Sequence, residues 1–64
     1  MIKIDEFVKL LDVFTRVEVV KNGDRTLFNG KVKDLKLQEL YEYHICKIIP
    51  CSTSRETYLE IDVY

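Results

Sequence analysis

The sequence has 64 residues, of which 47% are hydrophobic and 33% are charged. This length holds one small domain over residues 1–64, and the composition excludes both a disordered chain and a membrane-spanning helix. Ten basic and eleven acidic side chains give a net charge of −1, which does not supply the excess positive charge of a typical nucleic-acid-binding domain. The acidic start lacks the apolar segment of a signal peptide, so we expect a cytoplasmic protein with no membrane partner.

The first predicted element is an amphipathic helix over residues 3–12. Ile4, Phe7, Val8 and Leu11 recur at helical spacing. Leu10 and Phe14 widen this apolar stripe, which predicts a helix that covers one face of the core.

A β-hairpin is predicted next, because the apolar period changes to two at residues 15–20. Asn22-Gly23-Asp24 is typical of a tight reversal, since Asn and Gly tolerate positive φ. The return strand is expected over residues 26–33, with a bulge or a close backbone approach at Gly30.

The second half predicts a short helix and a second hairpin. Leu37, Leu40 and Tyr41 have helical spacing behind an expected N-cap at Asp34. Residues 43–49 are rich in β-formers and are expected to form a strand that Pro50 ends or marks as an edge. In the last strand Leu59, Ile61 and Val63 are expected to face inward, and Tyr58, Glu60, Asp62 and Tyr64 outward.

Together these elements predict an α+β domain in which the first helix packs on a curved, four-stranded antiparallel sheet with a short helix between the two hairpins. Sequential pairing of the strands would form a meander. The pattern leaves open whether the sheet closes into a small barrel of the SH3 or Sm kind. An uncovered edge would favour self-association.

His44, Cys46 and Cys51 form the one group of soft metal ligands. A zinc site normally needs four ligands at closer spacing, so we expect no metal or other cofactor and interpret the cysteines as structural thiols. Catalysis by Cys51 with His44 as base lacks an orienting partner. The sequence therefore predicts no catalytic residue, and the chain is not expected to be an enzyme.

Two kinds of side chain are candidates for a binding surface. Tyrosine is enriched where proteins meet partners, and lysines are in excess between residues 16 and 36. The chain could therefore carry opposite charges on two sides. The candidate binding residues are Tyr41, Tyr58, Tyr64, Lys31, Lys33 and Lys36.

Four segments resemble a family of short uncharacterised proteins encoded by phages and integrated mobile elements of Gram-positive gut bacteria. They are E-F-V-K-L-L-D at 6–12, R-V-E-V-V at 16–20, L-F-N-G-K-V-K-D-L at 27–35 and L-E-I-D-V at 59–63. The resemblance implies no activity and no catalytic residue.

These patterns favour a non-enzymatic module of phage or mobile-element origin that binds a protein partner or itself through a sheet edge or the tyrosines. The alternatives are a small nucleic-acid-associated barrel that uses Arg16, Lys31, Lys33 and Lys36 for phosphate contacts, or a small-molecule binder at an oligomer interface.

Overall fold

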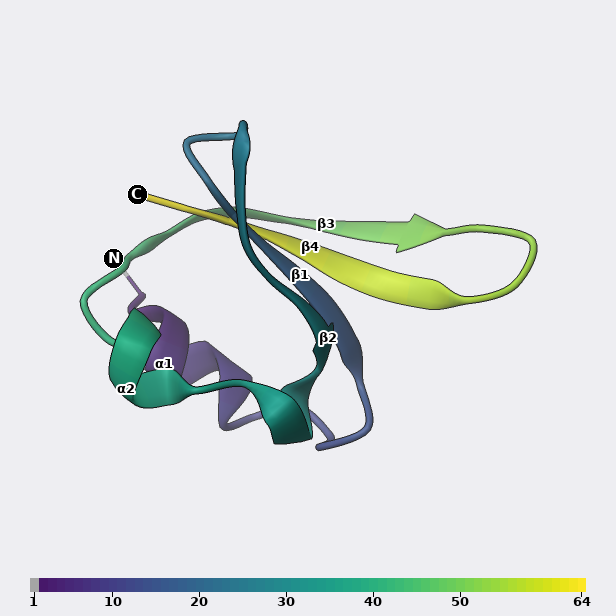
Figure 1. The fold of residues 1–64 in the computed structure, drawn as a ribbon, viewed down its shortest axis with the longest axis horizontal. Helices are drawn as coiled ribbons and strands as arrows, with labels where there is room; N and C mark the ends of the chain where they lie inside the picture. The colour runs from purple at the N-terminus through teal and green to yellow at the C-terminus, as the bar shows by residue number, and fades with distance from the viewer. Residues whose placement is uncertain (1) are drawn as a thin grey trace.

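The computed structural model describes residues 2–64, and its elements follow the predicted order of helix, hairpin, short helix and hairpin (Figure 1). Figure 1 shows the two α-helices side by side at one end and the second hairpin extending away from them. The elements are α1 (Ile4–Val8), β1 (Arg16–Lys21), β2 (Arg25–Lys31), the 3-10 turn η1 (Val32–Asp34), α2 (Leu37–Leu40), β3 (Ile45–Ser52) and β4 (Thr57–Val63).

The sheet has four strands in the order β2-β1-β4-β3. The predicted meander is therefore wrong: β1 pairs with β4 in parallel, while each hairpin is antiparallel. Pro50, which has no N–H to donate, suits the edge position of β3, as predicted. The segment with η1 and α2 connects β2 at one edge of the sheet to β3 at the other edge, and β4 lies between β1 and β3. In the described chain β2 and β3 do not pair, so the sheet is open and not a barrel.

The core lies between one face of this sheet, here called the inner face, and the helices. Val17 and Val19 of β1 and Ile61 and Val63 of β4 are fully buried, as the alternation predicts. The core residues contributed by the helices are Ile4, Val8 and Leu40.

The first helix is shorter than predicted. It ends at Val8, and a turn follows in which the amides of Leu10 and Leu11 donate to the carbonyls of Phe7 and Val8. Phe14 therefore lies outside the helix and does not extend its apolar stripe. No helix among residues 2–64 has the length and apolar character needed to cross a bilayer.

The predicted reversal at Asn22-Gly23 is confirmed. Both residues have positive φ, 55° and 78°, and the Asp24 amide donates to the Lys21 carbonyl at 3.2 Å. The bulge expected at Gly30 lies elsewhere on β2: the register shifts between the pairs Val19–Phe28 and Val20–Thr26. A Cβ at Gly30 would lie 3.1 Å from the Phe28 ring, so the close approach there comes from a side chain.

Two further boundaries differ from the predictions. Asp34 lies in η1 and does not cap α2, whose N-cap position is Lys36. Strand β3 continues through Pro50 to Ser52, because its pairing with β4 is kept on both sides of the proline. A residue without an N–H is tolerated on an edge strand.

Both sheet edges carry features that oppose pairing with another strand. The register shift kinks β2, and Pro50 removes one donor from β3. The start of β3 is also covered, since the Ile45 amide donates to the Ile2 carbonyl at 2.8 Å. Neither edge is a regular template for strand addition.

Candidate aromatic–lysine binding tip

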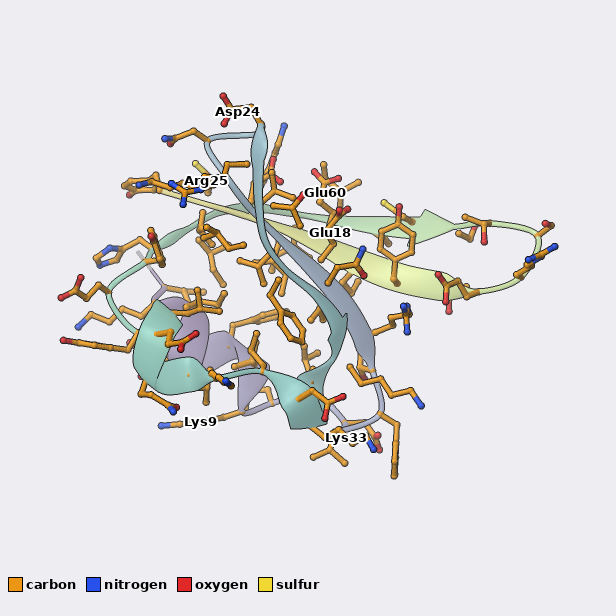
Figure 2. The ribbon with its side chains drawn as sticks, in the orientation of Figure 1. Lys9, Glu18, Asp24, Arg25, Lys33 and Glu60 are labelled. Atoms are coloured by element: carbon orange, nitrogen blue, oxygen red, sulfur yellow. The ribbon has the colours of Figure 1, made fainter. Side chains whose placement is uncertain are left out.

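Two of the predicted lysines meet at an exposed phenylalanine. The Nζ atoms of Lys31 and Lys33 each lie 5.8 Å from the centre of the Phe14 ring. Phe14 keeps 65% of its surface exposed and its neighbour Val13 keeps 52%. We call Val13, Phe14, Lys31 and Lys33 the aromatic–lysine tip. Lys33 is labelled in Figure 2, at the end of the molecule opposite the β1–β2 turn.

Hydrogen bonds fix the backbone of this tip. The Asp12 carboxylate accepts from the Phe14 amide at 2.8 Å, and the Thr15 amide donates to the Asp12 carbonyl at 3.0 Å, as in an Asx-turn. The Lys33 amide donates to the Val13 carbonyl at 2.9 Å. The apolar side chains are thus presented to solvent by a defined loop, which lowers the entropy cost of binding through them.

Sequence reasoning found the lysines of the tip but missed Phe14, which it placed on the helix. The signal that could have found it is Asp12 two residues before Phe14, because Asp in this position ends helices and starts Asx-turns.

The other two predicted cations make contacts of their own. Arg16 forms an ion pair with Glu56, with Nε and Oε2 3.1 Å apart. Lys36 lies at the start of α2 and lines a hollow of about 250 Å³ with Leu27, Phe28 and Glu39. Of the four cations predicted to contact phosphate, Arg16 is the register partner of Lys31 and Lys33 shares the Phe14 ring with Lys31, whereas Lys36 lies at the start of α2.

The predicted tyrosines do not form one surface either. Tyr58 is half-buried opposite Cys51, whereas Tyr64 lies six residues further along and stacks on His44 with ring centres 6.0 Å apart. Tyr41 is exposed after α2 and its hydroxyl donates to the Glu42 carboxylate at 3.3 Å. The pKa of Tyr58 is raised, first by its hydrogen bond with Cys51 and also by nearby negative charge.

Three carboxylates gather on the outer face of the sheet, opposite the face on which the described helices pack. Glu18 of β1 lies directly opposite Glu60 of β4, and Asp62 follows Glu60 on the same side of β4. Figure 2 shows Glu18 and Glu60 beside each other at mid-sheet. We call Glu18, Glu60 and Asp62 the carboxylate row.

Asp62 is buried, with 6% of its surface exposed, although the sequence predicts it on an open face. It lines a hollow of about 420 Å³ with Asn22, Gly23, Cys46 and Lys47. Its Oδ2 lies 3.7 Å from the Lys47 ammonium, whereas its Oδ1 has no hydrogen-bond partner within residues 2–64. The Asn22 amide donates to the Val63 carbonyl at 2.9 Å, so the start of the β1–β2 turn lies beside the end of β4, and Asn22 and Gly23 line the hollow together with Asp62.

The carboxylate row raises the pKa of Glu60 above its ordinary value of 4.5. The main cause is a hydrogen bond with Asp62, followed by desolvation and by the negative charges of Asp62 and Glu18, while Lys47 acts in the opposite direction. The row is thus a site of unmet negative charge.

The alternative of a metal site at His44, Cys46 and Cys51 is not supported. No three His, Cys, Asp or Glu side chains of the described chain are placed so that they could hold one metal ion, and both cysteines are free thiols. Cys51 lies near the far end of β3, where its thiol donates to the Ile49 carbonyl at 3.5 Å, and the bulge after Ile45 interrupts the alternation near His44.

Comparison with known protein families, curated proteins and solved structures finds no match to this chain. Its relation to phage and mobile-element proteins stays a prediction from the sequence.

Proposed function

We propose that the chain is a non-enzymatic protein-binding module whose contact surface is the aromatic–lysine tip. The observation that carries this proposal is the exposure of Phe14 between two lysine ammonium groups. Aromatic anchors dominate the energetics of protein interfaces, and the hydrogen-bonded loop holds the Phe14 backbone in a defined position. The two lysines favour a partner with acidic side chains around an apolar pocket.

The sheet edges are less suited to this role than the tip. The register shift in β2 and the proline in β3 both oppose addition of a strand. Binding through side chains at the tip needs no unpaired backbone groups, so neither the register shift nor the proline opposes it.

The test is a quantitative capture experiment in lysate of the source organism, followed by titration of each recombinant partner. Phe14→Ser and the pair Lys31→Glu/Lys33→Glu are compared with Tyr41→Ser and the pair Arg25→Glu/Lys36→Glu, which change an exposed aromatic and two exposed cations elsewhere. We expect the tip variants to weaken binding about tenfold or more and the control variants to leave it unchanged. Equal binding by tip and control variants would overturn the proposal.

A nucleic-acid partner is the second candidate, because an aromatic ring flanked by lysines is also how single strands are bound. Fluorescence anisotropy with a labelled oligothymidylate tests it, and binding that weakens steeply with salt and is lost in Phe14→Ser would replace the protein proposal. Flotation with anionic phosphatidylserine vesicles tests a lipid surface in the same way, and vesicle binding lost in the tip variants would equally overturn it.

A further inference from the structure

The sheet carries two sets of like charges that outnumber the opposite charges paired with them in the described chain. In the carboxylate row, Glu18 and Glu60 lie directly opposite each other, an arrangement that destabilises a sheet. Lys47 lies beside the row, with its Nζ 3.7 Å from Asp62 Oδ2, and is itself largely exposed. At the tip, Lys31 and Lys33 contact the Phe14 ring and form no ion pair among residues 2–64.

The two sets share one face of the sheet. Lys31 and Asn29 point to the same side of β2 because they are two residues apart beyond the register shift, and Asn29 pairs with Glu18. Arg16 is the register partner of Lys31 and precedes Glu18 by two residues on β1, but it forms an ion pair with Glu56. The outer face therefore has cations at its tip end and carboxylates in its middle.

A second observation concerns one buried oxygen of the carboxylate row. More than nine-tenths of the Asp62 side chain is buried, yet its Oδ1 accepts no hydrogen bond within the described residues. Buried carboxylates are normally paired, so a cation placed over Glu60 and Asp62 would relieve an existing cost.

We propose that a second copy of this chain is a partner of the tip, with Lys31 and Lys33 of each copy lying on the carboxylate row of the other across a two-fold axis. This inference rests on the proposed function, because it uses the tip as the contact surface, and it names the partner. Two-fold symmetry requires one patch that is complementary to itself, and a face with cations at one end and carboxylates in the middle meets this requirement. Phe14 of each copy then packs over the apolar atoms of the other copy's outer face.

Such a dimer differs from the edge-to-edge assembly expected from the sequence. It joins outer faces through charged side chains, so it does not need the kinked or proline-blocked edges. A small polar interface of this kind forms weak and salt-sensitive complexes.

The experiment is sedimentation equilibrium over a concentration series at about 30 mM and about 300 mM NaCl. The variants are Lys31→Glu/Lys33→Glu, which makes the tip acidic, and Glu18→Lys/Glu60→Lys, which makes the row basic. We expect the wild-type chain to dimerise at low salt, with a dissociation constant that rises about tenfold at high salt. Each double variant alone should be monomeric, because both of its surfaces then carry the same sign.

The deciding sample is an equimolar mixture of the two double variants. In a mixed dimer, the unchanged lysines of the Glu18→Lys/Glu60→Lys chain face the unchanged carboxylate row of the other chain. The acidic tip of the Lys31→Glu/Lys33→Glu chain faces the basic row of its partner. Both contacts then join opposite charges, so the mixture should recover the dimer. Circular dichroism confirms the fold of each variant, and Glu18→Gln/Glu60→Gln, expected to weaken the dimer about tenfold, replaces the lysine pair if that pair does not fold. Recovery supports the proposal, and a mixture that stays monomeric overturns it.

A monomeric wild-type chain at low salt also overturns the self-pairing. The proposed function is tested separately. If the tip variants lose binding to a captured protein while the wild-type chain is monomeric, the proposed function is retained without the self-pairing. If the tip variants change neither capture nor dimerisation, both proposals are overturned.

Discussion

The two faces of the sheet use alternate residues of the same strands for different purposes. On the inner face Val17, Val19 and Ile61 are fully buried under the helices. On the outer face the intervening Glu18 and Glu60 lie directly opposite each other. Because the strand period is two, neighbouring residues belong to opposite faces, and substitutions can change stability and recognition separately.

The largest expected effect is on the inner face. Ile61→Ala should lower the free energy of unfolding by about 3 kcal/mol, through lost burial and the cavity left behind. Ile48, its register partner on β3, is partly exposed, so Ile48→Ala should cost less than about 1 kcal/mol. Urea denaturation measures both, and equal losses would contradict the difference between centre and edge.

An intermediate effect with the opposite sign is expected at Asp62. Asp62→Val should raise the free energy of unfolding at neutral pH by about 1 kcal/mol, because it removes a buried carboxylate oxygen that has no donor and places a β-branched residue in a central strand. Lys47→Met, which leaves the carboxylate without its nearby cation, should destabilise the chain. A lower melting temperature for Asp62→Val would show that Asp62 has a partner in solution.

A smaller effect concerns the pH dependence of stability through Glu60. Its raised pKa means that the folded chain holds this proton more tightly than the unfolded chain does. The contribution of Glu60 to stability is therefore favourable at low pH and is lost as pH rises from about 4.5, the ordinary value, through the raised pKa of the folded state. Glu60→Gln should remove this part of the pH profile of the melting temperature. An unchanged profile would show that Asp62 and Glu18 do not act on Glu60.

The smallest effect on stability is expected at the aromatic–lysine tip. Phe14→Ser should change the free energy of unfolding by less than about 0.5 kcal/mol, since the ring is mostly exposed and its contacts with the two lysines are solvated. The same variant should lose binding. A large loss of stability would instead make Phe14 a structural residue and would remove the main support for the tip as an interface.

The sequence predicts local structure here better than topology. The turn at Asn22-Gly23 and the inward positions of Ile61 and Val63 are confirmed because they depend on φ preferences and on the strand period, which are local. The parallel pairing of β1 with β4 was not predicted, because the alternation of Val17 and Val19 states which face is buried but not which strand lies beside it.

The candidate site was predicted only in part, for a similar reason. Lys31 and Lys33 could be selected from the charge distribution, whereas their contact with Phe14 depends on the end of α1 at Val8 and on the Asx-turn at Asp12. The opposition of Glu18 and Glu60 follows from the parallel register and could not be read from either strand alone. Side-chain neighbours across strands become predictable only when the topology is known.

The central position of β4 also determines when the chain can fold during synthesis. β1 obtains its second neighbour only from the last strand of the sequence, with Val17 opposite Leu59. Until β4 has left the ribosome, a nascent chain has β1 and β2 as an isolated hairpin with the buried positions of β1 exposed, and two-stranded hairpins are marginal in water. Pairings that are this distant in sequence slow folding. The hydrophobic core should therefore form in one late step after synthesis of β4, and ribosome-stalled chains that lack this strand should remain sensitive to protease.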